Sequence, residues 1–195
     1  MWNIPNILTL LRIVLIPVFV LLFYLPLESA RFSCALVFSI AAVTDWFDGY
    51  LARRWGQVSP FGAFLDPVAD KLMVAVALLL LVQADPTPAL AIPAAVIIGR
   101  EITISALREW MAELGARAEV AVSVIGKFKT AVQMVAILLL IYDEPLMGIP
   151  IFTVGFVLLY VAAALTLWSM ALYLKAAWPS LLGERRHGTE LERDE

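Results

Sequence analysis

The chain has 195 residues, and 62 % of them are hydrophobic, compared with about half in soluble domains. Its mean hydropathy is +0.89 and the apolar residues form long runs, which excludes a soluble globular enzyme and indicates a protein embedded in lipid. The net charge of −3 is small, and a single cysteine, Cys34, excludes an intrachain disulfide.

Six stretches of the chain are apolar enough to cross a bilayer, which takes about 20 residues of helix. The connections between them are short, so we predict one all-α integral membrane domain with six transmembrane helices over residues 1–178. A polar, flexible tail is expected over residues 179–195. In chain order the six stretches cover 8–26, 31–52, 64–83, 87–108, 119–142 and 148–176.

The first residues are expected to lie along the membrane surface. Pro5 is predicted to start or kink a short interfacial helix that places Trp2, Ile4, Ile7 and Leu8 in the headgroup layer. No basic segment precedes the first apolar run, so we expect this run to remain as an anchor rather than to be removed as a signal peptide.

Basic residues are divided unequally between the two sides of this six-helix arrangement. Thirteen fall toward the side that holds both termini, and only Arg31 falls on the other. Because positive residues are enriched on the cytoplasmic side of membrane proteins, both termini are predicted to be cytoplasmic. The thirteen are Arg12, Arg53, Arg54, Lys71, Arg100, Arg108, Arg117, Lys127, Lys129, Lys175, Arg185, Arg186 and Arg193.

Four aspartates lie where the second predicted span ends and the third begins. Asp45 and Asp48 are three residues apart, and Asp66 and Asp70 are four apart, so each pair shares one face of a helix. Four carboxylates placed together repel one another strongly, and two divalent cations neutralise them. Oxygen ligands favour Mg²⁺ or Mn²⁺, and the absence of nearby Cys or His disfavours zinc.

The alternative is four solvated acids at helix ends, paired with Arg53, Arg54 or Lys71. The matched helical register of both pairs favours the metal site. Small residues at Gly49 and Gly62 leave room beside the metals for a large flat ligand, with helix packing as their alternative role. An arginine such as Arg53 can bind a phosphate, so the pattern suits a nucleotide diphosphate bridged by two metals.

These positions together resemble the signature of the CDP-alcohol phosphatidyltransferases. A bare pair of aspartates is a weak signal, whereas eight positions at matching spacing are highly specific. The positions read Asp45-x-x-Asp48-Gly49-x-x-Ala52-Arg53-x8-Gly62-x-x-x-Asp66-x-x-x-Asp70. Three further segments, at 3–12, 100–110 and 126–130, resemble the bacterial members of the family that use glycerol 3-phosphate, so the resemblance covers about residues 1–178.

The resemblance implies a multi-pass homodimer in the bacterial cytoplasmic (inner) membrane, with its active site open to the cytoplasm. It implies transfer of a phosphatidyl group from CDP-diacylglycerol to glycerol 3-phosphate, in anionic phospholipid synthesis. The implied metal ligands are Asp45, Asp48, Asp66 and Asp70, with Asp70 also the catalytic base. The implied CDP-diacylglycerol contacts are Gly49, Ala52, Arg53, Ser59 and Gly62, together with Asn6 and Thr9, which have helix capping as their alternative role.

A second basic cluster lies further along the chain. An acceptor that carries its own phosphate needs cations, and we predict that Arg100, Arg108, Lys127 and Lys129 bind the phosphate of glycerol 3-phosphate. The alternative is flanking charge of the positive-inside type. Arg100 fits that alternative poorly because it lies well within an apolar helix.

Three other functions remain possible at this stage. The nearest is a sister enzyme with another acceptor, such as serine or inositol phosphate. The second is an aspartate-rich membrane prenyltransferase, which the glycine, alanine and arginine positions of the signature disfavour. The third is a cation transporter, which predicts acidic residues in mid-membrane on several helices rather than at one end of two. We expect the bilayer as a partner, and no nucleic acid.

Overall fold

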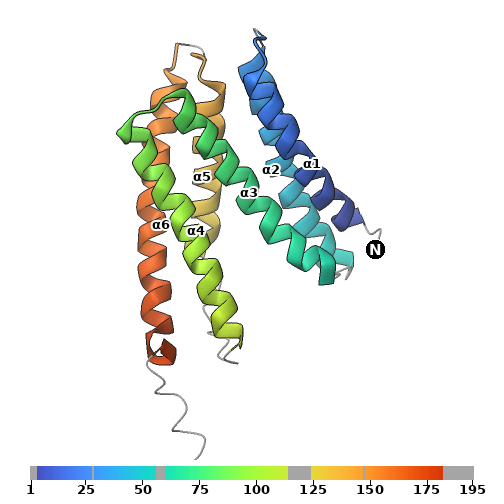
Figure 1. Ribbon diagram of the computed structural model, residues 1–195, viewed down its shortest axis with the longest axis vertical. Helices are drawn as coiled ribbons and strands as arrows, with labels where there is room; N and C mark the ends of the chain where they lie inside the picture. The colour runs from blue at the N-terminus through green and yellow to red at the C-terminus, as the bar shows by residue number, and fades with distance from the viewer. Residues whose placement is uncertain (1–3, 28, 56–59, 114–123, 147, 182–195) are drawn as a thin grey trace, which may run out of the picture.

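The computed structural model describes residues 4–27, 29–55, 60–113, 124–146 and 148–181, and within them it is entirely helical apart from short connections. The six helices run along the chain without any strand between them in these described ranges (Figure 1). An isolated bridge pairs Leu146 with Ile149 just before the last helix. The helices are α1 (Ile4–Tyr24), α2 (Ala30–Trp55), α3 (Pro60–Ala84), α4 (Pro88–Glu113), α5 (Val124–Tyr142) and α6 (Ile151–Leu181).

Local chemistry explains several of the helix ends. α3 and α4 each begin with a proline, Pro60 and Pro88, whose missing N–H is no loss in the first turn of a helix. α5 ends before Asp143, which adopts a left-handed conformation with φ of 49°. The turn toward α6 then passes through Gly148, whose φ of 80° suits glycine.

The N-terminal region differs from the prediction. We expected a separate short interfacial helix at Pro5, but α1 begins at Ile4 and continues as one helix to Tyr24, so that prediction is wrong for the described residues. The reason is that a proline in the first turn leaves the helix intact. At the other end of the chain, α6 runs through Pro179 to Leu181, past the predicted domain end, and residues 182–195 lie outside the described part.

The helices form two groups of three that pack side by side. α1 packs against α2 and α3, while α6 packs against α4 and α5 (Figure 1). Contacts of α2 with α5 and of α3 with α4 join the groups. The shared core is apolar and includes Phe19, Phe38, Leu78, Ile97 and Ile137, all of them nearly inaccessible to solvent.

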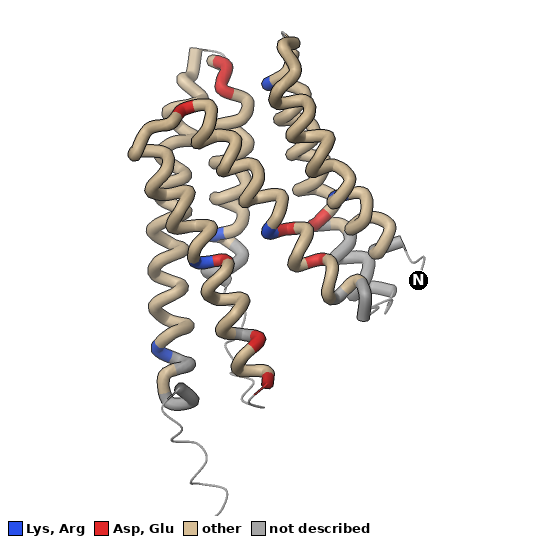
Figure 2. Tube along the Cα trace, viewed as in Figure 1, with Lys and Arg blue, Asp and Glu red and all other residues tan. Residues whose placement is uncertain are grey.

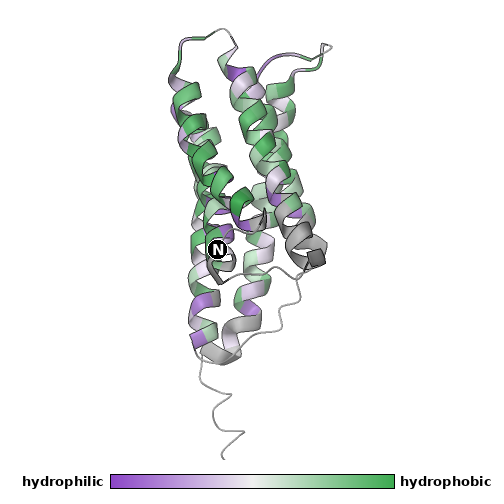
Figure 3. Cartoon of the chain, turned by 90° about the vertical axis from the view of Figure 1, so that its right-hand side faces the viewer, coloured by the Kyte–Doolittle hydropathy of each residue, from purple (hydrophilic) through white to green (hydrophobic). Residues whose placement is uncertain are grey.

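The outer surface of the bundle is also apolar. Large side chains such as Leu21, Phe64, Ile102 and Trp168 are about two-thirds exposed, with 67, 67, 65 and 64 % of their surface accessible. Hydrophobic residues dominate the upper part of the helices, and hydrophilic residues gather lower down (Figure 3). A continuous apolar surface of this kind suits contact with lipid chains.

Three helices meet the length and composition of a membrane span among the described residues. They comprise Asn6–Tyr24, Pro88–Glu113 and Ile151–Lys175, and the apolar part of α5, Phe128–Tyr142, is shorter. The part of the chain that the structure describes is therefore all-helical, with six helices, and has the apolar helices of a membrane protein. That all six cross the bilayer stays a prediction. α1 begins and α6 ends at the same, lower end of the bundle in Figure 1, as an even number of crossings requires.

Candidate active site

Three of the predicted aspartates converge between α2 and α3. Asp45 lies in the C-terminal half of α2, and Asp66 and Asp70 lie one turn apart near the start of α3. One carboxylate oxygen from each of the three lies within 4.8 Å of the other two. The predicted hairpin therefore brings carboxylates from both helices together. The side chain of Asp48 lies outside the described residues.

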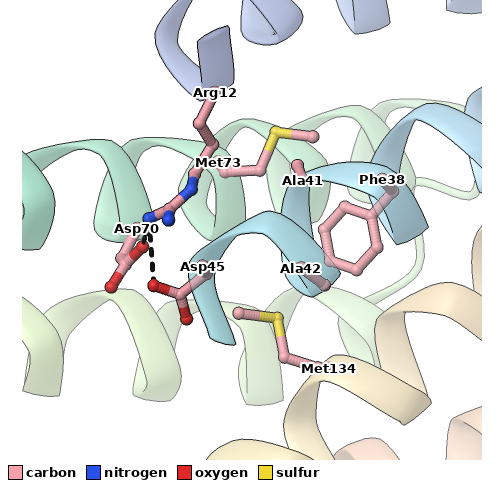
Figure 4. A pocket seen from close by; sticks show the side chains of 8 residues that line it. All are labelled: Arg12, Phe38, Ala41, Ala42, Asp45, Asp70, Met73 and Met134. Atoms are coloured by element: carbon pink, nitrogen blue, oxygen red, sulfur yellow. Dashed lines mark hydrogen bonds and ion pairs between the residues drawn. The ribbon is translucent and has the colours of Figure 1, made fainter. Parts of the chain in front are cut away.

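A buried arginine from a third helix joins the three carboxylates. Arg12 of α1 is only 1 % exposed, and its Nη1 lies 3.0 Å from Asp45 and 3.4 Å from Asp66. The same nitrogen donates to Asp70, so one guanidinium contacts all three acids. Figure 4 shows its contacts with Asp45 and Asp70. Three carboxylates and one guanidinium leave a formal charge of −2, which a divalent cation can balance.

From the sequence, Arg12 counts among the basic residues of the cytoplasmic side and ends the N-terminal segment of the family resemblance, without a role in the site. A signal for its role was present, because an ionisable residue inside an apolar helix usually has a partner and a function. What the sequence could not supply was the identity of that partner. The acids contacted by Arg12 lie 54 and 58 residues further along the chain, on α3, as well as on α2.

Two other predicted residues share the buried side of α1 with Arg12. Asn6 and Thr9 are each 2 % exposed, and residues 6, 9 and 12 follow at intervals of three. Neither residue stands at the N-cap, because α1 already begins at Ile4, so capping does not explain them. Both polar side chains point into the protein rather than into lipid.

A cavity of about 180 Å³ opens beside the carboxylates, between α2, α3, α4 and α5. Asp45 and Asp70 form part of its wall. A much smaller pocket next to it lies among Arg12, Phe38 and the same two aspartates, and Figure 4 shows the arginine reaching into it from α1. The polar residues that line the larger cavity are Asp45, Asp70, Lys71, Glu101, Thr130 and Gln133.

Comparison with known proteins now identifies the family. Residues 2–168 match the protein family described as CDP-alcohol phosphatidyltransferase. The chain belongs to this family. It is 57 % identical over 183 residues to the CDP-diacylglycerol–glycerol-3-phosphate 3-phosphatidyltransferase of Shigella flexneri serotype 5b (strain 8401), covering 94 % of this chain and 99 % of that protein. It is 56 % identical, with the same coverage, to the protein of that name from Escherichia coli (strain K12).

The carboxylate cluster of this CDP-alcohol phosphatidyltransferase has the chemistry of a hard-metal site. Its three described acids supply only oxygen ligands, which suits Mg²⁺ or Mn²⁺ better than softer metals. Their side chains are 31 to 38 % exposed, so they are open on one side to an incoming ligand. Together with the excess negative charge, this donor set fits a divalent cation.

The predicted nucleotide contacts fall mostly outside the described side chains. Gly49, Ala52 and Arg53 lie on the last turns of α2, and Ser59 precedes α3 in the part that is not described. Gly62 lies in the first turn of α3, one turn before Asp66, which places it beside the carboxylate cluster.

The second predicted cluster is organised around a glutamate. Glu101 of α4 accepts hydrogen bonds from Arg100, at 2.6 Å, and from Lys129 of α5, at 2.9 Å. Arg100 also reaches Ser169 of α6 at 3.4 Å. Two of the four predicted phosphate-binding cations, Arg100 and Lys129, are therefore brought together. With Glu101 between them, the three side chains carry a net charge of +1. The side chains of Arg108 and Lys127 lie outside the described residues.

The two clusters border the same cavity, the first through Asp45 and Asp70 and the second through Glu101. Lys71 follows Asp70 on α3 and donates to Ser105 of α4, whose hydroxyl in turn donates to the carbonyl oxygen of Glu101, at 2.7 Å. Figure 2 shows acidic and basic residues of several helices gathered in the lower part of the bundle, beneath long stretches without charge. The geometry places the carboxylates of Asp45 and Asp70, together with Lys71 and Glu101, around one small space.

Proposed function

We propose that this chain is a metal-dependent CDP-diacylglycerol–glycerol-3-phosphate 3-phosphatidyltransferase. It transfers the phosphatidyl group of CDP-diacylglycerol to glycerol 3-phosphate and releases phosphatidylglycerophosphate and CMP, a step of anionic phospholipid synthesis. The observation that carries the chemistry is the convergence of Asp45, Asp66 and Asp70 beside the cavity. The choice of acceptor is supported by the relatives that are 56 and 57 % identical over nearly their whole length.

In this proposal the four aspartates hold two divalent cations, Mg²⁺ or Mn²⁺. Such ions, when bound, polarise a diphosphate and stabilise the charge that develops on the leaving CMP. Arg12 fixes the three described carboxylates relative to one another and reduces their mutual repulsion. Asn6, Thr9, Gly49, Ala52, Arg53, Ser59 and Gly62 are proposed to contact the CDP-diacylglycerol.

The remaining side chains are assigned to the acceptor. Asp70, which lines the cavity, takes the proton of the acceptor hydroxyl. The hydroxyl oxygen then forms a bond to the phosphorus that carries diacylglycerol, and the bond from that phosphorus to CMP breaks. Arg100 and Lys129, oriented by Glu101, are proposed to bind the acceptor phosphate together with Arg108 and Lys127.

The membrane arrangement completes the proposal. All six helices cross the bacterial cytoplasmic membrane, both termini and the active site face the cytoplasm, and the enzyme works as a homodimer. CDP-diacylglycerol enters from the bilayer, and glycerol 3-phosphate enters from the cytoplasm. Membership of the family removes the prenyltransferase and the transporter from consideration.

A CMP-release assay tests the proposal directly. Purified protein is given CDP-diacylglycerol and, separately, glycerol 3-phosphate, glycerol, serine or inositol phosphate, in Mg²⁺ or in excess chelator. We expect CMP release only with glycerol 3-phosphate and only with the metal. Asp66→Asn should lower the rate by more than about a hundredfold, since even the indirect partners of metal ligands are worth about 10- to 100-fold.

The matched control is Asp85→Asn, the same substitution between α3 and α4 at the opposite end of α3 from Asp66. It should keep the rate of the unmodified protein. CMP release with serine but not with glycerol 3-phosphate would identify a sister enzyme instead. An undiminished rate in chelator would refute the metal dependence.

A further inference from the structure

Gln133 is a buried polar residue whose side-chain carbonyl oxygen lacks a hydrogen-bond partner among the described residues. It lies on α5 and is 4 % exposed, and its Oε1 makes no hydrogen bond to any residue that the structure describes. Buried side-chain oxygens are nearly always satisfied, because an unpaired one loses its hydration without compensation. Helix packing alone therefore gives no reason for a glutamine at this position.

The position of Gln133 supplies that reason. The residue lines the cavity of about 180 Å³ that Asp45 and Asp70 also line. That space is far larger than the roughly 10–15 Å³ that one water molecule needs, so it can hold a small organic ligand. Gln133 lies one helical turn from Lys129, which is bound to Glu101, and directly before Met134, which faces Asp45 and Asp70 in the smaller pocket. It therefore opens onto the same space as the carboxylates of Asp45, Asp70 and Glu101.

The chemistry of the amide selects a hydroxyl as its ligand. A glutamine amide offers both an acceptor and two donors, and a hydroxyl can pair with either end of it. A phosphate is a poor partner for a carbonyl oxygen, because both groups offer hydrogen-bond acceptors. The part of an acceptor that fits beside Gln133 is thus its neutral polyol portion.

We propose that Gln133 binds the acceptor hydroxyl that does not react, and so selects a vicinal diol over a simple alcohol. The proposal rests on the proposed function. Glycerol 3-phosphate has hydroxyls on C1 and C2, and if the C1 hydroxyl gives its proton to Asp70, the C2 hydroxyl is left for Gln133. An acceptor without the C2 hydroxyl leaves the buried amide unpaired, which is the situation in which enzymes discriminate strongly.

The test compares two acceptors that differ only in the C2 hydroxyl. The kcat/KM for CMP release from CDP-diacylglycerol is measured with glycerol 3-phosphate and with 3-hydroxypropyl phosphate. The unmodified enzyme should favour glycerol 3-phosphate by about 10- to 100-fold. In Gln133→Met this preference should fall to nearly one, because glycerol 3-phosphate is used less well while 3-hydroxypropyl phosphate is used about equally.

Gln83→Met is the matched control, since Gln83 accepts a hydrogen bond from Tyr24 at the other end of α3 from the aspartates. It should retain the preference of the unmodified enzyme. If Gln133→Met does not fold, Gln133→Asn is measured instead. The asparagine side chain is shorter by one methylene, so its amide no longer reaches the same position. The preference for glycerol 3-phosphate over 3-hydroxypropyl phosphate should therefore also fall.

Two results overturn the proposal while leaving the proposed function in place. One is an unchanged preference in the Gln133 variants, and the other is an equal loss with both acceptors, which indicates a packing role. Absence of CMP release with either acceptor in the unmodified enzyme overturns the proposed function, and the role of Gln133 falls with it.

Discussion

At the scale of single residues, Arg12 is the group on which the geometry of the carboxylates depends. Its guanidinium contacts acids on two other helices and is almost fully removed from solvent. Removing one partner of a buried ion pair leaves uncompensated charge, which is far more costly than losing a solvated pair. The chain contains such a solvated pair for comparison, between Arg31 and Asp143, where the arginine side chain is 58 % exposed.

We therefore predict that Arg12→Met and Arg31→Met differ greatly in their effect on stability. In chelator, Arg12→Met should lower the free energy of unfolding by about 2–3 kcal/mol. This is no more than the smallest loss expected for breaking a fully buried ion pair, because the three acids are about one-third exposed. Arg31→Met should cost less than about 1 kcal/mol. Thermal unfolding in detergent measures both, and about 5–10 °C of lowering is expected for Arg12→Met.

Added Mg²⁺ should restore part of the stability that Arg12→Met loses. A divalent cation neutralises the same carboxylates, and binding to the folded state stabilises it by mass action. The exposed Arg31→Met variant should gain no more from Mg²⁺ than the unmodified protein. Equal melting temperatures for the two variants in chelator would show that Arg12 contributes no more than a surface ion pair.

At the scale of the elements, the contact between α5 and α6 depends on a glycine. A Cβ at Gly155 of α6 would lie 3.0 Å from Leu139 Cβ and 3.1 Å from the carbonyl oxygen of Ala136, both on α5. Neither atom is the flexible end of a side chain. Small residues commonly allow this close approach of helices in membranes, where lipid removes the hydrophobic drive for association.

Gly155→Ala and Gly99→Ala provide a matched pair for testing this contact. Both glycines lie within helices, where alanine is favoured by about 0.8–1.0 kcal/mol. A Cβ at Gly99 meets no atom within 4 Å, so the melting temperature of the Gly99→Ala variant should equal or exceed that of the unmodified protein. Gly155→Ala should melt several degrees lower than Gly99→Ala, because overpacking costs about 1–3 kcal/mol. Equal melting temperatures for the two variants would show that α5 and α6 can shift apart at little cost to accommodate the added Cβ.

At the scale of the whole molecule, the charges define an orientation. The aspartate cluster and the Glu101 cluster lie in the lower part of the bundle, the end at which α1 begins and α6 ends (Figures 1 and 2). The opposite end carries the Arg31–Asp143 pair. The thirteen-to-one division of basic residues predicts that the lower end is cytoplasmic.

Cysteine labelling in intact cells checks this orientation. The only native cysteine, Cys34, is buried and gives a low background. A membrane-impermeant maleimide that reaches the outer face of the cytoplasmic membrane should label Glu144→Cys, in the connection between α5 and α6. It should label Glu113→Cys, at the end of α4, only after the membrane is opened. The reverse pattern would invert the predicted topology.

The sequence by itself determined the features that depend on spacing along one helix or across one hairpin. The six apolar stretches, the charge asymmetry and the pairing of Asp45 with Asp66 and Asp70 all follow from local periodicity and a short connection. The separate helix at Pro5 is the local prediction that was wrong, because proline is compatible with the first turn of a continuous helix.

Only the tertiary structure decided which distant side chains meet. Arg12 enters the carboxylate cluster from α1, Glu101 joins Arg100 to Lys129 across 28 residues of chain, and Gln133 opens onto the cavity beside Asp70. The physical reason is that these helices are apolar on every side, because the faces turned away from the protein core are in contact with lipid. Periodicity then cannot tell a buried face from a lipid-facing one, and the rotation of each helix is settled by packing and polar contacts with its neighbours.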